Sequence, residues 1–345
     1  MGIYMGLSRQ VIESLPKIEL HRHLDGDIKP DLIFELAKEQ NIKLPVDNKK
    51  DLNRYFSKKR EEGFNSLITD GFGLVNTVLQ TGEALRRAAY ESVRNMKNEN
   101  IIYGELRFAP ELHTEKGLSY KQAIYEARMG MKEAEKDFGI STNLISCICR
   151  NSSAELGEQI AKTVMDSQMY TVALDLACDE ANNPPEKHKK AYELTFNTDI
   201  KRTVHAGELG NCQYQNMVTA INTLHADRIS HAIHISEYKD LINIVREKNI
   251  GIEMSPKSNI YCKFIKSTKD LNITKLIKEN VLVSINSDDP AMFEYTLCDT
   301  LYEVANDYNL EIGSLKQLQL NAIQMAFTNN KIKEKLRRII TDTYK

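Results

Sequence analysis

The sequence predicts a single α/β domain built as an eight-stranded barrel of the (β/α)8, or TIM, type. Short apolar runs rich in β-branched residues recur along the chain, and a helix-like or polar segment follows each of them. There are eight such runs, and eight alternating units favour a closed parallel barrel. We expect the strands at Ile18–Leu20, Ile101–Phe108, Asn143–Ile148, Val172–Ala177, Lys201–His205, Arg228–His231, Gly251–Met254 and Val281–Ile285.

Length and composition agree with this fold. A chain of 345 residues suits one barrel with insertions, so we expect residues 1–345 to form one domain. The formal net charge of −2 indicates neither a nucleic-acid partner nor a membrane surface. No apolar run approaches the ~20 residues that span a bilayer, and the first ten residues lack a signal-peptide pattern. The six cysteines are scattered without C-x-x-C spacing, which favours a reducing cytoplasm.

A long insertion separates the first two predicted strands. The first helix is expected to begin at Pro30, because proline is favoured in the first turn of a helix. Residues 45–100 follow, and within them Glu83–Lys97 has the pattern of an amphipathic helix. An insertion after strand one of a barrel lies over the carboxyl-terminal mouth, where active sites are found. We therefore expect part of residues 45–100 to act as a helical lid; the alternative is an outer helical layer.

The first predicted strand ends in two histidines, His21 and His23. In an extended strand, residues i and i+2 point to the same face, so the two imidazoles are expected to project together. Paired imidazoles suit a divalent transition metal such as zinc.

Polar side chains also follow four later strands. Because the carboxyl ends of barrel strands converge on one mouth, these side chains can meet His21 and His23 despite their separation in sequence. Three imidazoles and one carboxylate can hold zinc and leave room for a water molecule. The residues concerned are Cys178-Asp179-Glu180, His205-Ala206-Gly207-Glu208, His231 and Ser287-Asp288-Asp289-Pro290.

Two of these residues suit proton transfer. Zinc lowers the pKa of a bound water toward ~7, and His231 suits the base that takes or orients its proton, because imidazole titrates near neutrality. Glu208 suits the acid that protonates the substrate, provided that desolvation keeps it protonated.

The order of these motifs resembles that of the adenosine deaminase family, over a range from Pro16 to Phe327. Weaker matches lie at Leu174–Glu180 and Ser255–Asn259, and Arg107–Pro110 with Gly117–Ser119 is similar to the bacterial members. The main matches are His21–Gly26, Val204–Glu208, Arg228–His231 and Ser284–Pro290. The family fold is an eight-stranded α/β barrel, in agreement with the strands predicted above.

The resemblance implies a role for each matching residue. One zinc ion would be bound by His21, His23, His205 and Asp288. Glu208 would donate a proton to purine N1, His231 would position or deprotonate the water, and Asp289 would bond N7. The substrate would be bound by His23, Asp25, Cys178 and Asp289. The Asp25 carboxylate would hold the ribose 5′-hydroxyl, and the backbone N–H of Cys178 would donate a hydrogen bond to purine N3.

The implied function is zinc-dependent hydrolytic deamination of adenosine and 2′-deoxyadenosine to inosine and ammonia, in purine salvage in the cytoplasm. The partner would be a small-molecule purine nucleoside, without nucleic acid or membrane. The alternative substrates are adenine and an N6-modified adenosine. A carboxylate at Asp25 would repel a 5′-phosphate and gives ribose a partner, so it favours a nucleoside over a nucleotide or a free base.

Three departures from the family pattern concern four residues. Cys178 occupies a site that is normally glycine, where a side chain adds bulk and restricts φ. Ser230 and Ala232 replace the glycines that usually flank His231, and Arg22 is larger than the usual apolar residue and is expected to point away from the metal. These departures motivate a further alternative, a catalytically impaired relative that keeps metal and nucleoside binding.

Two other hydrolase classes fit the sequence less well. A two-metal hydrolase on the same barrel needs a bridging lysine or acidic residue at strand four; Thr171–Cys178 contains no lysine, although Asp175 leaves an acidic bridge open. The His-x-Glu and Pro-Cys-x-x-Cys signature of cytidine-type zinc deaminases is absent.

Overall fold

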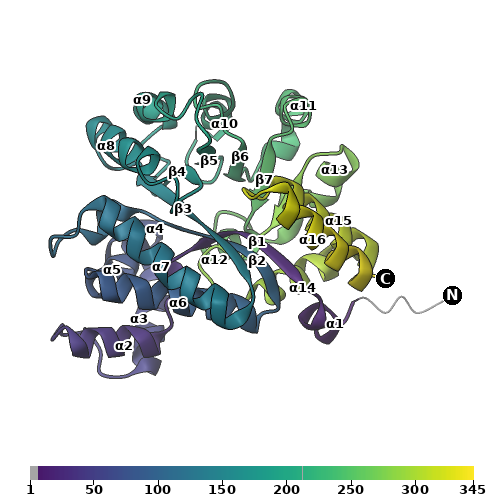
Figure 1. Ribbon diagram of the computed structural model, residues 1–345. Helices are drawn as coiled ribbons and strands as arrows, with labels where there is room; N and C mark the ends of the chain where they lie inside the picture. Colours follow the sequence, from purple (N-terminus) through teal and green to yellow (C-terminus); the bar gives the residue numbers. More distant parts are fainter. Residues whose placement is uncertain (1–6, 212) are drawn as a thin grey trace.

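A computed structural model of the protein describes residues 7–211 and 213–345. Within these residues, eight parallel strands follow one another in chain order around a barrel, as Figure 1 shows. Residues 1–6, part of the stretch inspected for a signal peptide, and Cys212 lie outside the described ranges. The strands are β1 (Lys17–His23), β2 (Ile101–Phe108), β3 (Ser141–Cys149), β4 (Ala173–Ala177), β5 (Lys201–Ala206), β6 (Arg228–His231), β7 (Gly251–Met254) and β8 (Val283–Ile285).

The prediction of an eight-stranded barrel is confirmed, and β2, β6 and β7 have the predicted bounds. The largest difference is β1, which extends beyond the predicted Ile18–Leu20 at both ends. Its added residues are charged or imidazole side chains, yet all but His23 are buried. Polar partners from distant segments make this burial possible: Ser287 and Glu99, for example, accept hydrogen bonds from the Arg22 guanidinium.

The barrel closes between β1 and the segment that follows β8. Arg22 and Asp288 form a parallel bridge. The His23 N–H donates to the Asp288 carbonyl at 2.9 Å, and the Asp288 N–H donates to the His21 carbonyl at 2.8 Å. This closure brings the histidines of the first strand beside an aspartate from the far end of the chain.

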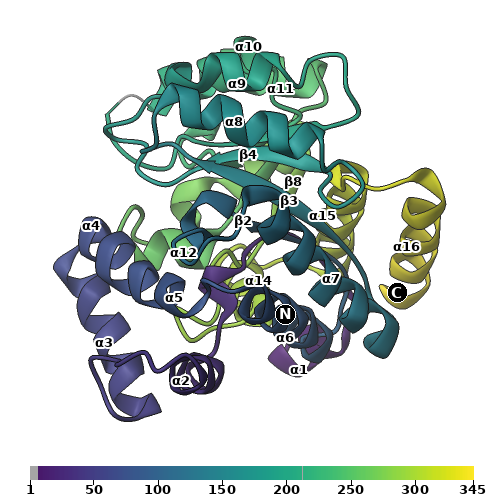
Figure 2. The ribbon, with the colours of Figure 1, turned by 60° about the vertical axis from the view of Figure 1, so that its left-hand side comes forward.

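Helices surround the strands on the outside of the barrel (Figures 1 and 2). Among the described residues, no helix is both long and apolar enough to cross a bilayer. The longest of the described helices, α7, is capped at both ends. Ser119 and Gln122 form a capping box at its start, and Gly139, with φ +67°, caps its end. The helices of eight or more residues are α2 (Pro30–Glu39), α3 (Lys49–Glu62), α6 (Gly82–Asn98), α7 (Tyr120–Phe138), α8 (Ala154–Met165), α10 (Gln213–Asn222), α11 (Lys239–Glu247), α14 (Leu297–Asp307), α15 (Ile312–Met325) and α16 (Asn330–Thr343).

Shorter helices connect these elements. They include α1 (Arg9–Ser14), α4 (Phe64–Ser66), α5 (Gly73–Val78), α9 (Lys189–Glu193), α12 (Pro256–Tyr261) and α13 (Ile273–Lys278). Single turns and a short π-helical segment complete them: η1 (Asp25–Asp27), η2 (Leu67–Phe72), η3 (Pro110–His113), η4 (Pro185–His188), η5 (Ile235–Glu237) and η6 (Thr268–Leu271).

The segment between β1 and β2 is helical, as predicted. The first helix, α2, begins at Pro30, and α6 covers the predicted amphipathic stretch Glu83–Lys97 with one further residue at each end. In Figures 1 and 2, α2 to α5 gather as one group on a single side of the barrel. The apolar side chains Phe64, Leu67 and Phe72 of this group border a pocket at the carboxyl end of the strands.

A ladder of buried ion pairs runs along the barrel axis and consists of Glu105, Arg107, Asp175, Arg228 and Glu253. Arg107 donates to Asp175 at 2.8 Å and to Glu253 at 2.7 Å. Arg228 donates to Glu105 at 2.6 Å and also pairs with Glu253. Every member is at most 1% exposed, so each charge depends on its partners in place of water.

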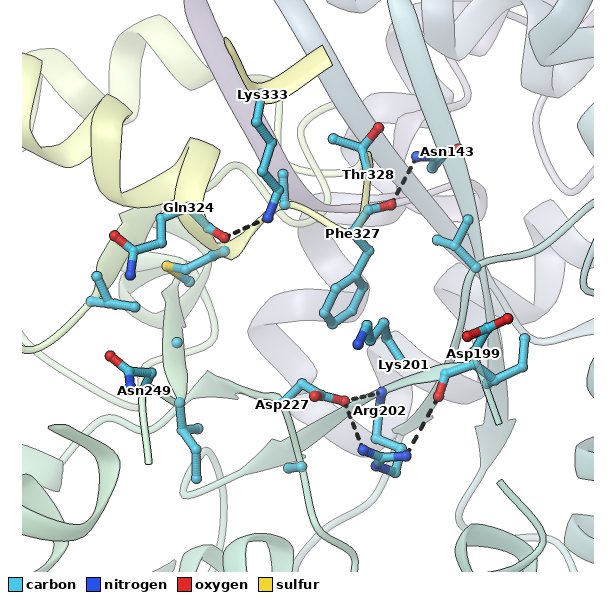
Figure 3. A pocket seen from close by; sticks show the side chains of 18 of the residues that line it. Asn143, Asp199, Lys201, Arg202, Asp227, Asn249, Gln324, Phe327, Thr328 and Lys333 are labelled. Atoms are coloured by element: carbon cyan, nitrogen blue, oxygen red, sulfur yellow. Dashed lines mark hydrogen bonds and ion pairs between the residues drawn. The ribbon is translucent and has the colours of Figure 1, made fainter. Parts of the chain in front are cut away.

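The ladder ends at the amino-terminal side of the barrel in a second, larger pocket, which Figure 3 shows from close by. There the guanidinium of Arg228 lies 3.5 Å from the centre of the Phe327 ring, and the Phe327 carbonyl accepts a hydrogen bond from Asn143 at 3.0 Å. Phe327 therefore covers the amino end of the axis.

Candidate active site

Four histidines and an aspartate converge at the carboxyl end of the barrel, where the sequence predicted a metal site. Asp288 Oδ1 lies 3.1 Å from His21 Nε2 and 3.5 Å from His23 Nε2, and the Nε2 atoms of His23 and His205 are 3.2 Å apart. The candidate ligand atoms of His21, His23 and Asp288 lie within 4.8 Å of one another, and so do those of His21, His205 and His231. The structure thus brings the four predicted ligands together and places His231 equally close.

Buried carboxylates behind the cluster orient two of its imidazoles. His21 Nδ1 lies 3.1 Å from Glu253, and His205 Nδ1 lies 3.2 Å from Asp175. A carboxylate partner favours the proton on Nδ1, which leaves the Nε2 lone pair free. His21 Nε2 is buried and has no hydrogen-bond partner among the described residues.

The charge state of the cluster also suits a cation. Burial lowers the pKa of His205 and, more strongly, that of His23, so both imidazoles are neutral at pH 7. Despite its burial, Asp288 has a pKa well below its ordinary value, because His21 faces it. The neutral imidazoles of His23 and His205 beside an ionised aspartate fit a divalent metal ion, and His21, whose pKa Asp288 and Glu253 raise against the effect of burial, would release its proton when the ion binds.

Glu208 is held by its backbone and desolvated at its side chain. The Glu180 carboxylate accepts hydrogen bonds from the backbone N–H groups of Gly207, Glu208 and Leu209 at 2.8–2.9 Å. The Glu208 carboxyl is buried beside Asp288, and burial first, then the Asp288 charge, raises its pKa well above the ordinary value. Both effects favour the protonated carboxyl of Glu208, which is the form that can donate a proton.

His231 faces both acids. Its Nε2 lies 3.6 Å from Glu208 and 3.9 Å from Asp288, and the Asn259 amide lies 3.0 Å from its Nδ1. His231 and Ala232 adopt φ values of +66° and +46°, the left-handed region that glycine occupies most readily. Although Ser230 and Ala232 replace the glycines of the family pattern, the His231 ring still lies in the histidine cluster.

The side chains of Ser230 and Arg22 point away from the cluster. Ser230 Oγ donates to Glu253 of the axial ladder at 2.8 Å. Arg22 bonds Ser287 at 3.1 Å and Glu99 at 2.9 Å, as expected for a side chain directed away from the metal ligands.

Two further carboxyl groups line the pocket: Asp289, which is buried, and Asp25, which is partly buried. Burial, and then the nearby Asp288, raises the pKa of Asp289 well above its ordinary value. Burial also raises the pKa of Asp25 to about 6. Gly26 makes room for this arrangement, because a Cβ atom built on it would lie 1.9 Å from Asp289 Oδ1.

Cys178 follows β4 and adopts φ +80°, the conformation for which the family pattern has glycine. The cysteine is therefore accommodated in the left-handed backbone, at the energetic cost that a Cβ atom adds there. Its side chain lines the pocket beside Ala177 and Cys149.

The pocket itself has a volume of about 230 Å³ and combines these polar groups with an apolar wall. The wall comes from the inserted helices and from Leu112 and Phe293. No lysine or arginine is among the described residues that line it. Such a lining suits a flat, uncharged ligand with a few polar atoms.

Several supporting residues were assigned no role from the sequence. Asp175, Arg107 and Glu253 orient the imidazoles, Glu180 fixes the turn that carries Glu208, and Asn259 contacts His231. A polar residue inside an otherwise apolar strand, such as Asp175 in Ala173–Ala177, is the signal that can reveal members of this set.

A parallel barrel with imidazole and carboxylate ligands at its carboxyl-terminal mouth is the architecture of the metal-dependent amidohydrolases. Within that class, the chain belongs to the adenosine deaminase family, whose sequence profile, described as "Adenosine deaminase", matches residues 16–343.

Individual relatives agree with this membership. An adenosine deaminase of Clostridium botulinum (strain Loch Maree / Type A3) is 36% identical over 334 residues, covering 96% of this chain and 98% of the relative. The crystal structure of an adenine deaminase from Arthrobacter aurescens superposes with a TM-score of 0.87 at 24% identity, over 95% of this chain and 99% of that one. An N6-methyl-AMP deaminase from Arabidopsis thaliana gives a TM-score of 0.84 at 22% identity, over 97% and 98%. The two structural likenesses concern the fold.

Proposed function

We propose that this protein deaminates adenosine and 2′-deoxyadenosine by hydrolysis, giving inosine or deoxyinosine and ammonia, in purine salvage in the cytoplasm. The observation that carries the proposal is a buried Glu208, whose pKa is raised well above the ordinary value, beside the histidine cluster in a pocket without lysine or arginine among its described lining residues. A proton donor next to ligands that fit a metal supports hydrolytic removal of an amine. A lining that contains carboxyl groups and no lysine or arginine among the described residues favours a nucleoside over a nucleotide, because a phosphate would find no cationic partner there.

One zinc ion per chain is the proposed cofactor, held by His21, His23, His205 and Asp288. When bound, zinc would lower the pKa of water toward ~7 and so make a nucleophile available at neutral pH. Asp175 and Glu253 would keep the imidazole lone pairs of His205 and His21 directed at it.

The protein's own side chains would move the protons. Glu208 would donate its proton to purine N1, which makes C6 more electrophilic. Burial keeps His231 neutral, with its pKa well below the ordinary value, so its imidazole can accept or orient the proton of the attacking water. Ammonia would leave from C6 after a second proton transfer.

Substrate orientation would depend on three groups around the pocket. Purine N7 is a hydrogen-bond acceptor, and a protonated Asp289 is the donor it needs. The backbone N–H of Cys178 would donate a hydrogen bond to purine N3, and the Asp25 carboxyl would accept a hydrogen bond from the ribose 5′-hydroxyl. His23 would lie between the metal and the sugar.

The inserted helices would form a lid. Phe64, Leu67, Ile68 and Phe72 line the pocket from residues 45–100, so their displacement would open a path for the nucleoside.

The test is a substrate panel on purified protein reloaded with zinc. Ammonia release is measured with adenosine, 2′-deoxyadenosine, adenine, N6-methyladenosine and AMP, with zinc content determined on the same sample. We expect turnover of the two nucleosides with one zinc per chain. Preferential turnover of adenine or N6-methyladenosine would replace the proposed substrate with one of the alternatives. Nucleoside binding without turnover in the zinc-loaded protein would support the impaired relative instead.

A further inference from the structure

Cysteines are concentrated at the pocket. Of the five cysteines in the described parts of the chain, four line it: Cys147, Cys149, Cys178 and Cys262. The fifth, Cys298, lies on α14, away from this pocket. The proposed reaction uses none of the four thiols.

Two of these thiols are in contact. Cys149 is the last residue of β3 and pairs with Ala177 of β4, so Cys178 lies one residue further along the neighbouring strand. The two thiols lie close enough for each to shift the pKa of the other, and both side chains pack against a small apolar cluster formed by Ala109, Cys147 and Ala177. The positive φ of Cys178 is part of the backbone geometry that brings its thiol to Cys149.

The pair is accessible, whereas the neighbouring Cys147 is not. Cys149 and Cys178 are partly exposed at the pocket surface. Cys147 is 1% exposed, and its sulfur lies 3.6 Å from an Asp175 oxygen. An oxidant that enters the pocket therefore meets Cys149 and Cys178 first.

A buried carboxyl next to the pair can take a thiol proton. The Glu111 Oε1 atom accepts the N–H of Cys149 at 2.7 Å, and its Oε2 atom is buried without a hydrogen-bond partner among the described residues. Burial raises the pKa of Glu111 to about 7, within reach of thiol chemistry at physiological pH. The neighbouring Cys178 thiol lowers the pKa of Cys149, whereas the pKa of Cys178 is raised, so Cys149 is the better nucleophile of the two.

We propose that Cys149 and Cys178 form a modification site, a dithiol that hydrogen peroxide converts to a reversible disulfide on the wall of the substrate pocket. The Cys149 thiolate attacks one peroxide oxygen, the O–O bond breaks, and Cys149 sulfenic acid forms while the departing hydroxide takes up the thiol proton to give water. The Cys178 sulfur then attacks the sulfenic sulfur; the S–S bond forms, the S–O bond breaks, and a second water leaves with the remaining proton. Two thiols lose two electrons in total, and peroxide gains them.

The disulfide should weaken substrate use. An S–S bond of ~2.05 Å is much shorter than the separation of two hydrogen-bonded sulfur atoms, so the backbone at Cys178 must shift toward β3. This consequence rests on the proposed function, in which the Cys178 N–H meets purine N3. A shift of this kind at a positioning group can lower kcat/KM by about 10²-fold.

The test treats the reduced, zinc-loaded protein with hydrogen peroxide and follows three quantities: intact mass, disulfide-linked peptides after digestion without reductant, and kcat/KM for adenosine. We expect a loss of two hydrogen atoms in mass, a peptide linking Cys149 to Cys178, and a fall in kcat/KM of about 10²-fold that dithiothreitol reverses. Cys149→Ser should retain its activity through the same treatment. Cys298→Ser, the matched control outside the pocket, should behave as the wild type does.

Two results would overturn the proposal. One is the absence of the Cys149–Cys178 peptide after oxidation, and the other is equal inactivation of Cys149→Ser and the wild type. The mass and peptide readouts do not depend on turnover. A chain that forms the cross-link but never deaminates adenosine therefore contradicts the proposed function, and not the modification site.

Discussion

The two ends of the barrel carry pockets of opposite character. The amino-end pocket has a volume of about 1220 Å³, and its lining includes the exposed Lys201 and the partly exposed Lys333, whose ammonium donates to the Gln324 carbonyl at 2.7 Å (Figure 3). The carboxyl-end pocket has a volume of about 230 Å³ and gathers buried acids and imidazoles. In the smaller pocket, burial shifts the pKa of Glu208 and Asp289 upward and that of His231 downward. Desolvated, converging titratable groups mark the candidate site, and volume does not.

The sharpest test of this contrast is the replacement of one titratable residue in each pocket by a residue that does not titrate. Glu208→Gln removes the proposed acid without changing shape, so we expect kcat to fall by ~10²–10⁴ with zinc content unchanged, measured by ammonia release and metal analysis. Lys333→Met in the amino-end pocket should leave kcat within about twofold. Full activity in Glu208→Gln would remove the acid assignment.

The amino end should matter for stability instead. Phe327 is 9% exposed, and Arg228 lies against its ring, so Phe327→Ala removes packing and a cation–π contact. We expect a loss of about 3 kcal/mol in the free energy of unfolding by urea titration, with kcat of the folded protein unchanged. A loss of under ~1 kcal/mol would show that Phe327 does not hold the end of the axis.

The axial ladder provides a third comparison. Asp175→Asn removes the carboxylate behind His205, so zinc affinity should fall by about 10–100-fold in a chelator competition. Asp227→Asn at the amino end, where the side chain pairs with Arg202, should leave zinc affinity unchanged. Unchanged affinity in Asp175→Asn would mean that the carboxylate does not orient the ligand.

The smallest expected effect concerns pH. Burial raises the pKa of Glu111 from 4.5 to about 7 in the folded protein, so its contribution to stability is fully present below about pH 4.5. That contribution is lost as pH rises through about 7, because the folded state must then ionise a buried carboxyl. Glu111→Gln should therefore reduce the drop in Tm between pH 5 and pH 8 by about 2 °C. Asp199→Asn, the same kind of change at an exposed carboxylate, should leave the drop in Tm unchanged. An equal drop in Tm for the two variants would contradict the explanation by burial.

The sequence revealed strand ends better than strand interiors. The recurring apolar runs located all eight strands, and the polar residues after them identified the mouth, because backbone direction alone brings those ends together. In β1, burial of Arg22 could not be predicted, since the Glu99 carboxylate that accepts its hydrogen bond lies 77 residues away, whereas the buried Lys17 ammonium donates to the nearby Leu15 carbonyl.

The supporting residues were the hardest to predict. Glu180 lies in a motif that the sequence highlighted, yet its hydrogen bonds run to backbone N–H groups 27–29 residues away. Arg107 and Glu253 lie 146 residues apart, and their pairing depends on the barrel's closure. The sequence also could not determine whether Cys178 adopts the left-handed backbone, because that choice depends on the packing around it.

The axial ladder limits how this site can be moved or rebuilt. Glu253 contacts two arginines and one of the proposed ligands, so replacing any residue of the axial ladder changes the electrostatic potential at both ends of the barrel. Substitutions along it should be strongly non-additive, and double-mutant cycles should return large coupling terms. A designer who grafts only the mouth residues onto another barrel would transfer the ligands without their orientation. A working transfer must therefore include the residues at the carboxyl-terminal mouth together with the axial ladder behind them.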